Sequence, residues 1–170
     1  MTLDKLQRLM LVNQYEILSR LDPSSKSDYE ERLEILRSGY EVFYSDFTAG
    51  FCDPMSTSKS KFVLDVLDMY RAIEQFKNDN PKTTVFNGSV YSHFRGYDGN
   101  HETEYMGFVR FLIDVQQKYG EQIPYKDKTD NFNSHLPMID NYRAMLAVWT
   151  AIQNNYSLTE KDVDEILKAP

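Results

Sequence analysis

Apolar residues recur every three or four positions along most of this chain, the spacing of one face of an α-helix. Near the N-terminus, Leu6, Met10 and Ile17 follow it, with charged and amide side chains between them. This pattern predicts an amphipathic helix over residues 3–21. Pro23 ends the helix, because a proline disfavours helical geometry in the residue before it.

A second helix is predicted over residues 27–38. Ser27 or Asp28 is placed to accept the first free backbone N–H groups, and Gly39 to supply the left-handed stop. The segment 40–47, YEVFYSDF, is compatible with a short strand or with a helical turn or two. We expect helix there, because a lone strand has no partner.

The same spacing predicts four further helices. They cover residues 57–78, the segment from Asn100 to Gly120, residues 137–153 and the segment from Ser157 to Lys168. Asn100 is expected to be the N-cap of the second of these, and Ser157 to Glu160 to form a capping box in the last. The predicted fold class is therefore all-α: one compact domain of about six helices over residues 1–170.

One segment carries a signal for β-structure. Asn87-Gly88 lies between TTVF and SVYS, a pattern typical of a two-residue hairpin turn. A single hairpin is only marginally stable by itself. We therefore expect residues 83–92 to form a loop, with at most a minor hairpin against the helices.

Charge and apolar content limit the partners and the compartment. With 19 basic and 26 acidic residues the net charge is −7, which repels nucleic acid, and the basic residues are scattered. Apolar runs such as MLAVW (145–149) are far shorter than a membrane span of about 20 residues. The N-terminus has no signal-like run, and Cys52 is the only cysteine, which excludes an internal disulfide. We expect neither a nucleic-acid nor a membrane partner, and a cytoplasmic location.

Metal and catalytic motifs were sought in the polar segment FRGYDGNHETEYMGFVRFL (94–112). Taking Asp98 as the first residue of a calcium loop places Thr103 where glycine is required. The run HETEY lacks the two histidines, four residues apart, of a zinc protease helix. No nucleotide-binding or nucleophile motif is present either. We therefore predict no metal site, no cofactor and no catalytic residue.

The same segment supports two interpretations. Asp98 or Asn100 would cap the following helix by accepting its free backbone N–H groups. Alternatively, Arg95, Asp98, His101 and Glu102 would line a polar pocket for a small ligand. Arg110, within the apolar run GFVRFLIDV, is expected to pair with a carboxylate on another helix, with anion binding as the alternative.

The chain resembles the YfbU family of bacterial proteins. The resemblance rests on QRLMLVNQYEIL with LDP (7–23), Gly39-Tyr40, LDVLDMYRAI (64–73), FRGYD (94–98), EYMGFVRFLIDV (104–115), FNSHLPM (132–138), YRAMLAVW (142–149) and NYSLTEKDVDEIL (155–167). Segments 79–92 and 120–131 match poorly. The resemblance implies a small, mainly helical, cytoplasmic bacterial protein and carries over no reaction and no functional residue.

Two functional hypotheses follow. The first is a non-enzymatic helical binding or assembly protein that forms homo-oligomers, because runs such as FVLDVLDMY and MGFVRFL hold more apolar residues than one buried stripe needs. The second is a small-ligand-binding protein or enzyme that uses the pocket around Arg95, Asp98, His101 and Glu102. The sequence alone names no ligand, partner or pathway.

Overall fold

The computed structural model describes all 170 residues and is all-α, as predicted. Helical geometry covers 63% of the residues in six α-helices and several shorter helical turns, and no strands pair into a sheet. The chain forms two compact units, Met1–Pro54 and Met55–Pro170, each with its own cluster of buried apolar residues. A single domain over residues 1–170 stays a prediction.

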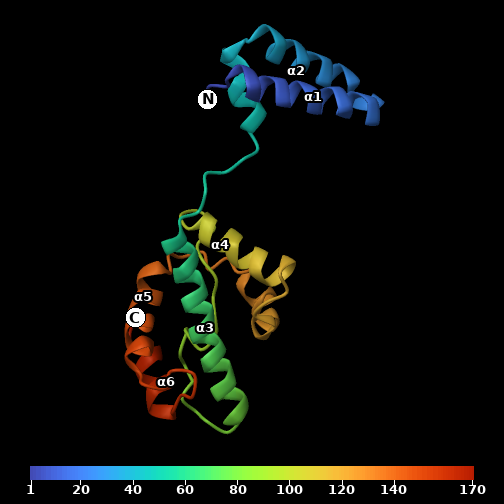
Figure 1. Cartoon of the computed structure of the whole chain (residues 1–170). Helices are drawn as coiled ribbons and strands as arrows, with labels where there is room; N and C mark the ends of the chain where they lie inside the picture. Colours follow the sequence, from blue (N-terminus) through green and yellow to red (C-terminus); the bar gives the residue numbers. More distant parts are fainter. The chain divides into compact units, whose positions relative to one another are not determined.

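The N-terminal unit is a helical hairpin. Helices α1 (Lys5–Leu21) and α2 (Lys26–Ser38) pack side by side, joined by a 3-10 turn, Pro23–Ser25 (Figure 1). The predicted helical turns at 40–47 are confirmed as a 3-10 helix, Glu41–Thr48. The buried centre of this unit is small and consists of Val12, Leu33 and Leu36.

The ends of the hairpin helices follow local capping rules only in part. Asp4 caps α1, since its side chain accepts the Gln7 N–H at 2.8 Å. Gly39 ends α2 in the left-handed region at φ +73°, as predicted. The predicted caps Ser27 and Asp28 are wrong, because α2 begins earlier and both lie in its first turn.

The C-terminal unit is built around the long helix α3 (Thr57–Asp79). Helix α4 (Thr103–Arg110) and its π-helical continuation Phe111–Val115 lie on one side of α3, and α5 (Ile139–Ala151) and α6 (Glu160–Leu167) lie on the other (Figure 1). Two 3-10 segments, Gly120–Tyr125 and Asp127–Thr129, occupy the connection between α4 and α5.

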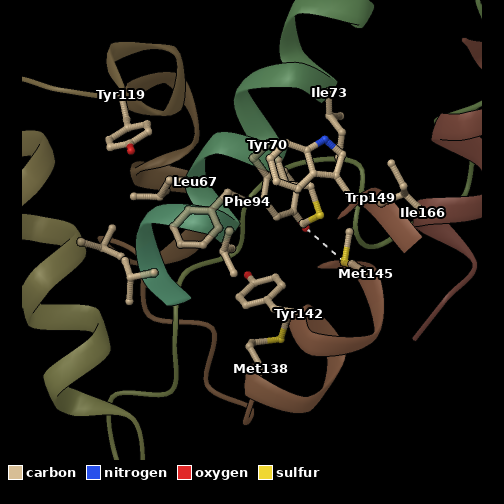
Figure 2. Packing of buried hydrophobic residues seen from close by; sticks show 14 of the residues in the cluster. Leu67, Tyr70, Ile73, Phe94, Tyr119, Met138, Tyr142, Met145, Trp149 and Ile166 are labelled. Carbon is tan, nitrogen blue, oxygen red and sulfur yellow. Dashed lines mark hydrogen bonds between the residues drawn. The ribbon is translucent and has the colours of Figure 1, made fainter. Parts of the chain in front are cut away.

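An aromatic cluster fills the centre of the C-terminal unit. Its fully buried side chains include Tyr70 of α3, Phe94, Tyr97, and Tyr142 of α5. The Tyr70 and Phe94 rings meet edge to face, with their centres 5.5 Å apart (Figure 2). The Tyr142 hydroxyl donates to the Gly96 carbonyl at 3.0 Å. Burial raises the pKa of Tyr142 well above its ordinary range. Such rings supply much of the buried apolar area of a core.

The apolar excess of FVLDVLDMY belongs to this core. Val63, Val66, Leu67, Met69 and Tyr70 are all fully buried. The hypothesis that this run forms an exposed interface is therefore wrong. The run holds more apolar residues than one buried stripe requires, because α3 is covered by helices on two sides and buries both of these faces.

Predicted boundaries in the C-terminal unit were shifted by tertiary contacts. Helix α4 begins at Thr103, so Asn100 is not its N-cap. The helical run ends at Val115, five residues before Gly120. The capping box of α6 joins Thr159 and Asp162 instead of Ser157 and Glu160.

The segment 83–92 forms a loop, as expected, and no hairpin. Its backbone makes successive tight turns, with the Asn87 N–H donating to Thr84 O at 3.0 Å and the Ser89 N–H to Phe86 O at 3.2 Å. Gly88 has φ +77°, so the Asn-Gly pair does form a turn. The flanking residues do not pair as strands, because the chain turns again on both sides.

Candidate functional site

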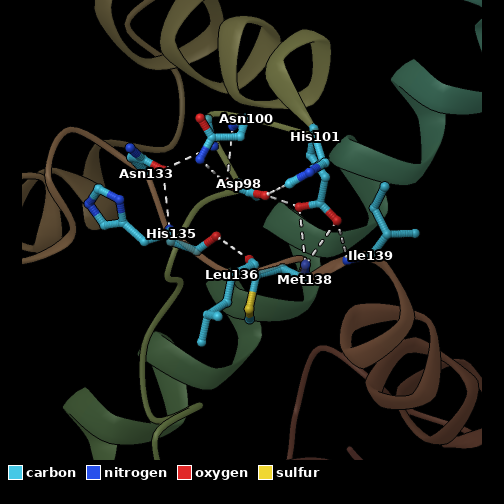
Figure 3. Close-up of polar contacts among 11 residues, drawn as sticks. Asp98, Asn100, His101, Asn133, His135, Leu136, Met138 and Ile139 are labelled. Carbon is cyan, nitrogen blue, oxygen red and sulfur yellow. Dashed lines mark hydrogen bonds and ion pairs between the residues drawn. The ribbon is translucent and has the colours of Figure 1, made fainter.

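Two segments distant in sequence run together at the start of α4 and of α5. Tyr97 N–H donates to Phe132 O at 3.0 Å, and Ser134 N–H donates to Tyr97 O at 3.1 Å. Gly96, at φ +85°, allows this approach, because a Cβ there would lie 1.9 Å from the Phe132 oxygen. The second segment is further fixed by Asn133, whose side-chain oxygen accepts the Gly99 N–H at 2.9 Å (Figure 3).

Glu102 joins the two segments from within the protein. Its side chain is buried, and its carboxylate accepts the Met138 N–H at 2.9 Å, the Ile139 N–H at 3.0 Å and the Asp98 N–H at 3.0 Å. Met138 and Ile139 are the N-cap and first residue of α5, where backbone N–H groups lack partners within the helix. Glu102 therefore caps a helix that begins 37 residues later.

Asp98 is buried beside Glu102 and orders the turn before α4 (Figure 3). Its carboxylate accepts the Asn100 N–H at 3.1 Å and pairs with Nδ1 of the exposed His101. The hydrogen bond from His101, aided by the Asn100 N–H, lowers the pKa of Asp98. Asp98 thus accepts a backbone N–H, as the capping interpretation required. The N–H belongs to Asn100, which lies in the turn before α4 and not in the helix itself.

The residues proposed for a polar pocket do not converge on one cavity. Asp98, His101 and Glu102 form the network just described, while Arg95 lines a separate cleft. Arg110 donates from Nε to the Asn131 carbonyl at 2.8 Å and makes no ion pair. The prediction that Arg110 pairs with a carboxylate is therefore wrong. Its guanidinium instead donates to a backbone carbonyl in the loop before α5.

The cleft beside Arg95 has a volume of about 540 Å³ and lies in the C-terminal unit. Its charged and titratable lining comprises His93, Arg95, Asp127, Lys128, Asp130 and His135. His135 pairs with Asp130 at 3.1 Å, but Arg95, Lys128 and Asp127 make no ion pair. The volume falls in the range of about 300–1,000 Å³ for small-molecule sites, but the lining is more polar than in most such sites, with Val90 as its apolar residue.

His93 lies close to three cations at this cleft. The half-buried imidazole stacks on Tyr125 with ring centres 4.9 Å apart. Burial, followed by the charges of Lys77, Arg95 and Lys128, lowers the pKa of His93. Arg95 and Lys128 have no carboxylate partner, whereas Lys77 is paired with Glu74 at 2.6 Å, so the two free cations would favour an anion beside the imidazole.

Backbone strain is concentrated in the connection between α4 and α5, from which Asp130 and His135 line the cleft. Every non-glycine residue with positive φ in the chain falls between Gln117 and His135, including Asp130, Asn131 and Phe132 in succession. Asp and Asn tolerate this region, but a bulky residue such as Phe132 rarely adopts it. Such strain is maintained by surrounding contacts and is common at ligand sites.

Most residues of this cleft were not predictable from the sequence pattern. Of its charged or titratable residues, only Arg95 was proposed as a site residue. His93, Lys128 and His135 come from three loop positions with no motif spacing between them. The only signal was indirect: the loop after α4 is long and polar, and long loops in compact domains often carry function.

A second candidate surface lies on α1. Leu6, Met10, Ile17 and Leu21 are 66%, 57%, 57% and 76% exposed, and they follow one another at intervals of four, seven and four residues. We define these four residues as the α1 stripe. The buried side of α1 carries Val12 instead. The apolar pattern that predicted this helix thus marks a face that does not pack on α2.

Metal-binding and membrane-spanning features were also sought. No group of three or more His, Cys, Asp or Glu side chains comes together to hold a metal ion. Cys52 is exposed and its thiol is free. None of the helices combines the length and the apolar content needed to cross a bilayer.

Comparison with known proteins assigns the family. The YfbU domain model matches residues 1–169. A relative from Methanocaldococcus jannaschii, UPF0304 protein MJECS11, is 44% identical over 169 residues, which cover 98% of this chain and 99% of the relative. The chain belongs to the YfbU family.

Proposed function

We propose that this protein is a non-enzymatic binding and assembly protein that forms homo-oligomers through the α1 stripe. The observation that carries the proposal is the exposure of Leu6, Met10, Ile17 and Leu21 on one face of a well-capped helix. Contiguous exposed apolar side chains commonly mark an interaction surface. We further propose the cytoplasm as its compartment, supported by the free thiol of Cys52.

The spacing of the stripe favours a second copy of the same helix as its occupant. Leu6, Met10, Asn13 and Ile17 follow one another at steps of four, three and four, the repeat that places one helix face against another. With 17 residues, α1 is about 26 Å long, which is short for an independent coiled coil. Two hairpins packed through their α1 helices as a four-helix bundle would supply the additional contacts.

A single-cysteine crosslink tests this assignment. Asn13 is the midpoint of α1, so it meets Asn13 of a second copy whether the two helices run parallel or antiparallel. In a Cys52→Ser background, Asn13→Cys should give a disulfide-linked dimer on mild oxidation at micromolar protein concentration. Lys5→Cys, one residue from Leu6 and therefore turned about 100° from it on the helix, is the control.

The two variants separate specific pairing from collision. Pairing through the stripe requires a much larger linked fraction for Asn13→Cys than for Lys5→Cys, because a disulfide needs Cα atoms within about 7 Å. Equal, small linked fractions for both variants would refute the proposed interface.

A further inference from the structure

We propose that the cleft beside Arg95 binds a small organic molecule through a phosphate group, with Arg95 and Lys128 as the charged contacts and His93 as a further donor. This site lies in the C-terminal unit and is independent of the α1 stripe. The cleft offers a ligand two cations without carboxylate partners, a volume of about 540 Å³ and further polar groups.

The two cations are available to a ligand. No carboxylate lies within ion-pair distance of the Arg95 guanidinium, and its side chain makes no hydrogen bond to the protein, although it is partly buried. Lys128 makes no ion pair and no side-chain hydrogen bond, and its Nζ lies 5.5 Å from the centre of the Tyr125 ring. An Arg fork and a Lys ammonium together form a common recognition set for phosphate oxygens.

The cleft has room for more than a phosphate group. Its volume of about 540 Å³ is several times the space that one water molecule occupies, and Val90 adds an apolar wall. Asp127, also without an ion-pair partner, supplies an acceptor for a ligand hydroxyl. These groups fit a hydroxylated phosphate monoester better than inorganic phosphate.

A nucleic-acid backbone does not fit this site. Asp127 and Asp130 stand in the same cleft as the two cations, so the second and third phosphates of a polyanion would meet carboxylates. The net charge of −7 also repels a long polyanion. A single phosphate close to Arg95 and Lys128 avoids both penalties.

Isothermal titration of the full-length protein, in a buffer free of phosphate, tests the proposal with ribose 5-phosphate and with inorganic phosphate. We expect the ester to bind more tightly than inorganic phosphate. Arg95→Gln and Lys128→Gln should each weaken ester binding by at least about tenfold. Arg143→Gln is the control, because Arg143 is an exposed arginine outside the cleft and pairs only with Asp140.

Several results would overturn the proposal. Absence of binding to the wild type in the millimolar range removes the site, and equal affinities of the Arg95→Gln and Arg143→Gln variants place the ligand elsewhere. Equal affinity for the ester and for inorganic phosphate refutes an organic ligand. If Arg95→Gln fails to fold, as judged by circular dichroism, Lys128→Gln decides, since Lys128 is exposed.

Sulfate isolates the part played by His93, because its charge stays constant between roughly pH 5 and 8, where histidine titrates. The charged and titratable groups around the imidazole are Lys77 with its partner Glu74, Arg95, Tyr125 and Lys128, and the cleft also holds Asp127 and the pair of Asp130 with His135. A bound dianion raises the pKa of His93 from its lowered value, so binding takes up a proton. Sulfate affinity should rise as the pH falls, and His93→Gln should remove part of that rise. An identical pH dependence in both proteins would exclude His93 from the site.

Discussion

Substitution of Met10 by alanine measures what the α1 stripe contributes to assembly. Met10 lies near the middle of α1 and is 57% exposed, so it contributes little to the buried centre of the hairpin. Alanine has a higher helix propensity than methionine, which keeps α1 intact. The change should therefore act on association and leave the folded monomer as stable as before.

The size of the effect follows from the exposed area. Full burial of a methionine side chain is worth about 1.5–3 kcal/mol, so burial of the exposed half is worth about 1 kcal/mol. In a two-fold interface the same side chain is buried once in each copy. Met10→Ala should then weaken dimerisation by about 2 kcal/mol, or roughly 30-fold in Kd.

Sedimentation equilibrium over a range of protein concentrations gives the dimer dissociation constants of the wild type and of Met10→Ala. Val42→Ala is the matched control, because Val42 is 79% exposed in the same unit but lies outside α1. It should leave the Kd within about twofold of the wild type. If Met10→Ala changes the Kd no more than Val42→Ala does, the stripe is not the interface and the reasoning fails.

Three further predictions concern the C-terminal unit, with the fluorescence of Trp149, the only tryptophan, as the unfolding signal. Glu102→Gln puts an NH₂ donor in place of one accepting oxygen of the carboxylate. Urea unfolding should show that the free energy of unfolding falls by about 1.5–3 kcal/mol. An unchanged urea midpoint would mean that Glu102 does not cap α5. Gly96→Ala forces a Cβ against the Phe132 carbonyl and should lower the free energy of unfolding by at least about 3 kcal/mol. A decrease below about 1 kcal/mol would contradict the close approach of the two backbones. Since the pKa of Asp98 is lowered, its stabilisation is present above the unfolded pKa of about 3.9 and is lost as the pH falls through the folded pKa. Wild type should therefore lose its stability advantage over Asp98→Asn below about pH 4, and a constant difference down to pH 2 would refute this.

Local sequence rules predicted the helices well because their signals are local. Periodicity located α1, α3 and α5, and the left-handed stop at Gly39 needed only the residue itself. The start of α5 could not be predicted in this way, since the carboxylate that caps it belongs to Glu102. No rule based on spacing along the chain identifies a cap 37 residues away.

The candidate sites were harder to predict than the helices. Periodicity reveals an apolar face but not which neighbour covers it, so Met10 and Ile17 were assigned to a face that the structure leaves exposed. Part of the cleft is formed by the connection between α4 and α5, whose backbone enters the left-handed region at Asp130, Phe132 and His135. Sequence patterns do not predict such conformations for a bulky side chain, because they exist only through tertiary contacts.

Native mass spectrometry of the untreated wild-type protein at micromolar concentration tests the central claim most directly, because it reports the number of chains in each species. Assembly through α1 predicts a main species of at least about 40 kDa, twice the 20.0 kDa chain. A single species of 20.0 kDa across the micromolar range would contradict the account.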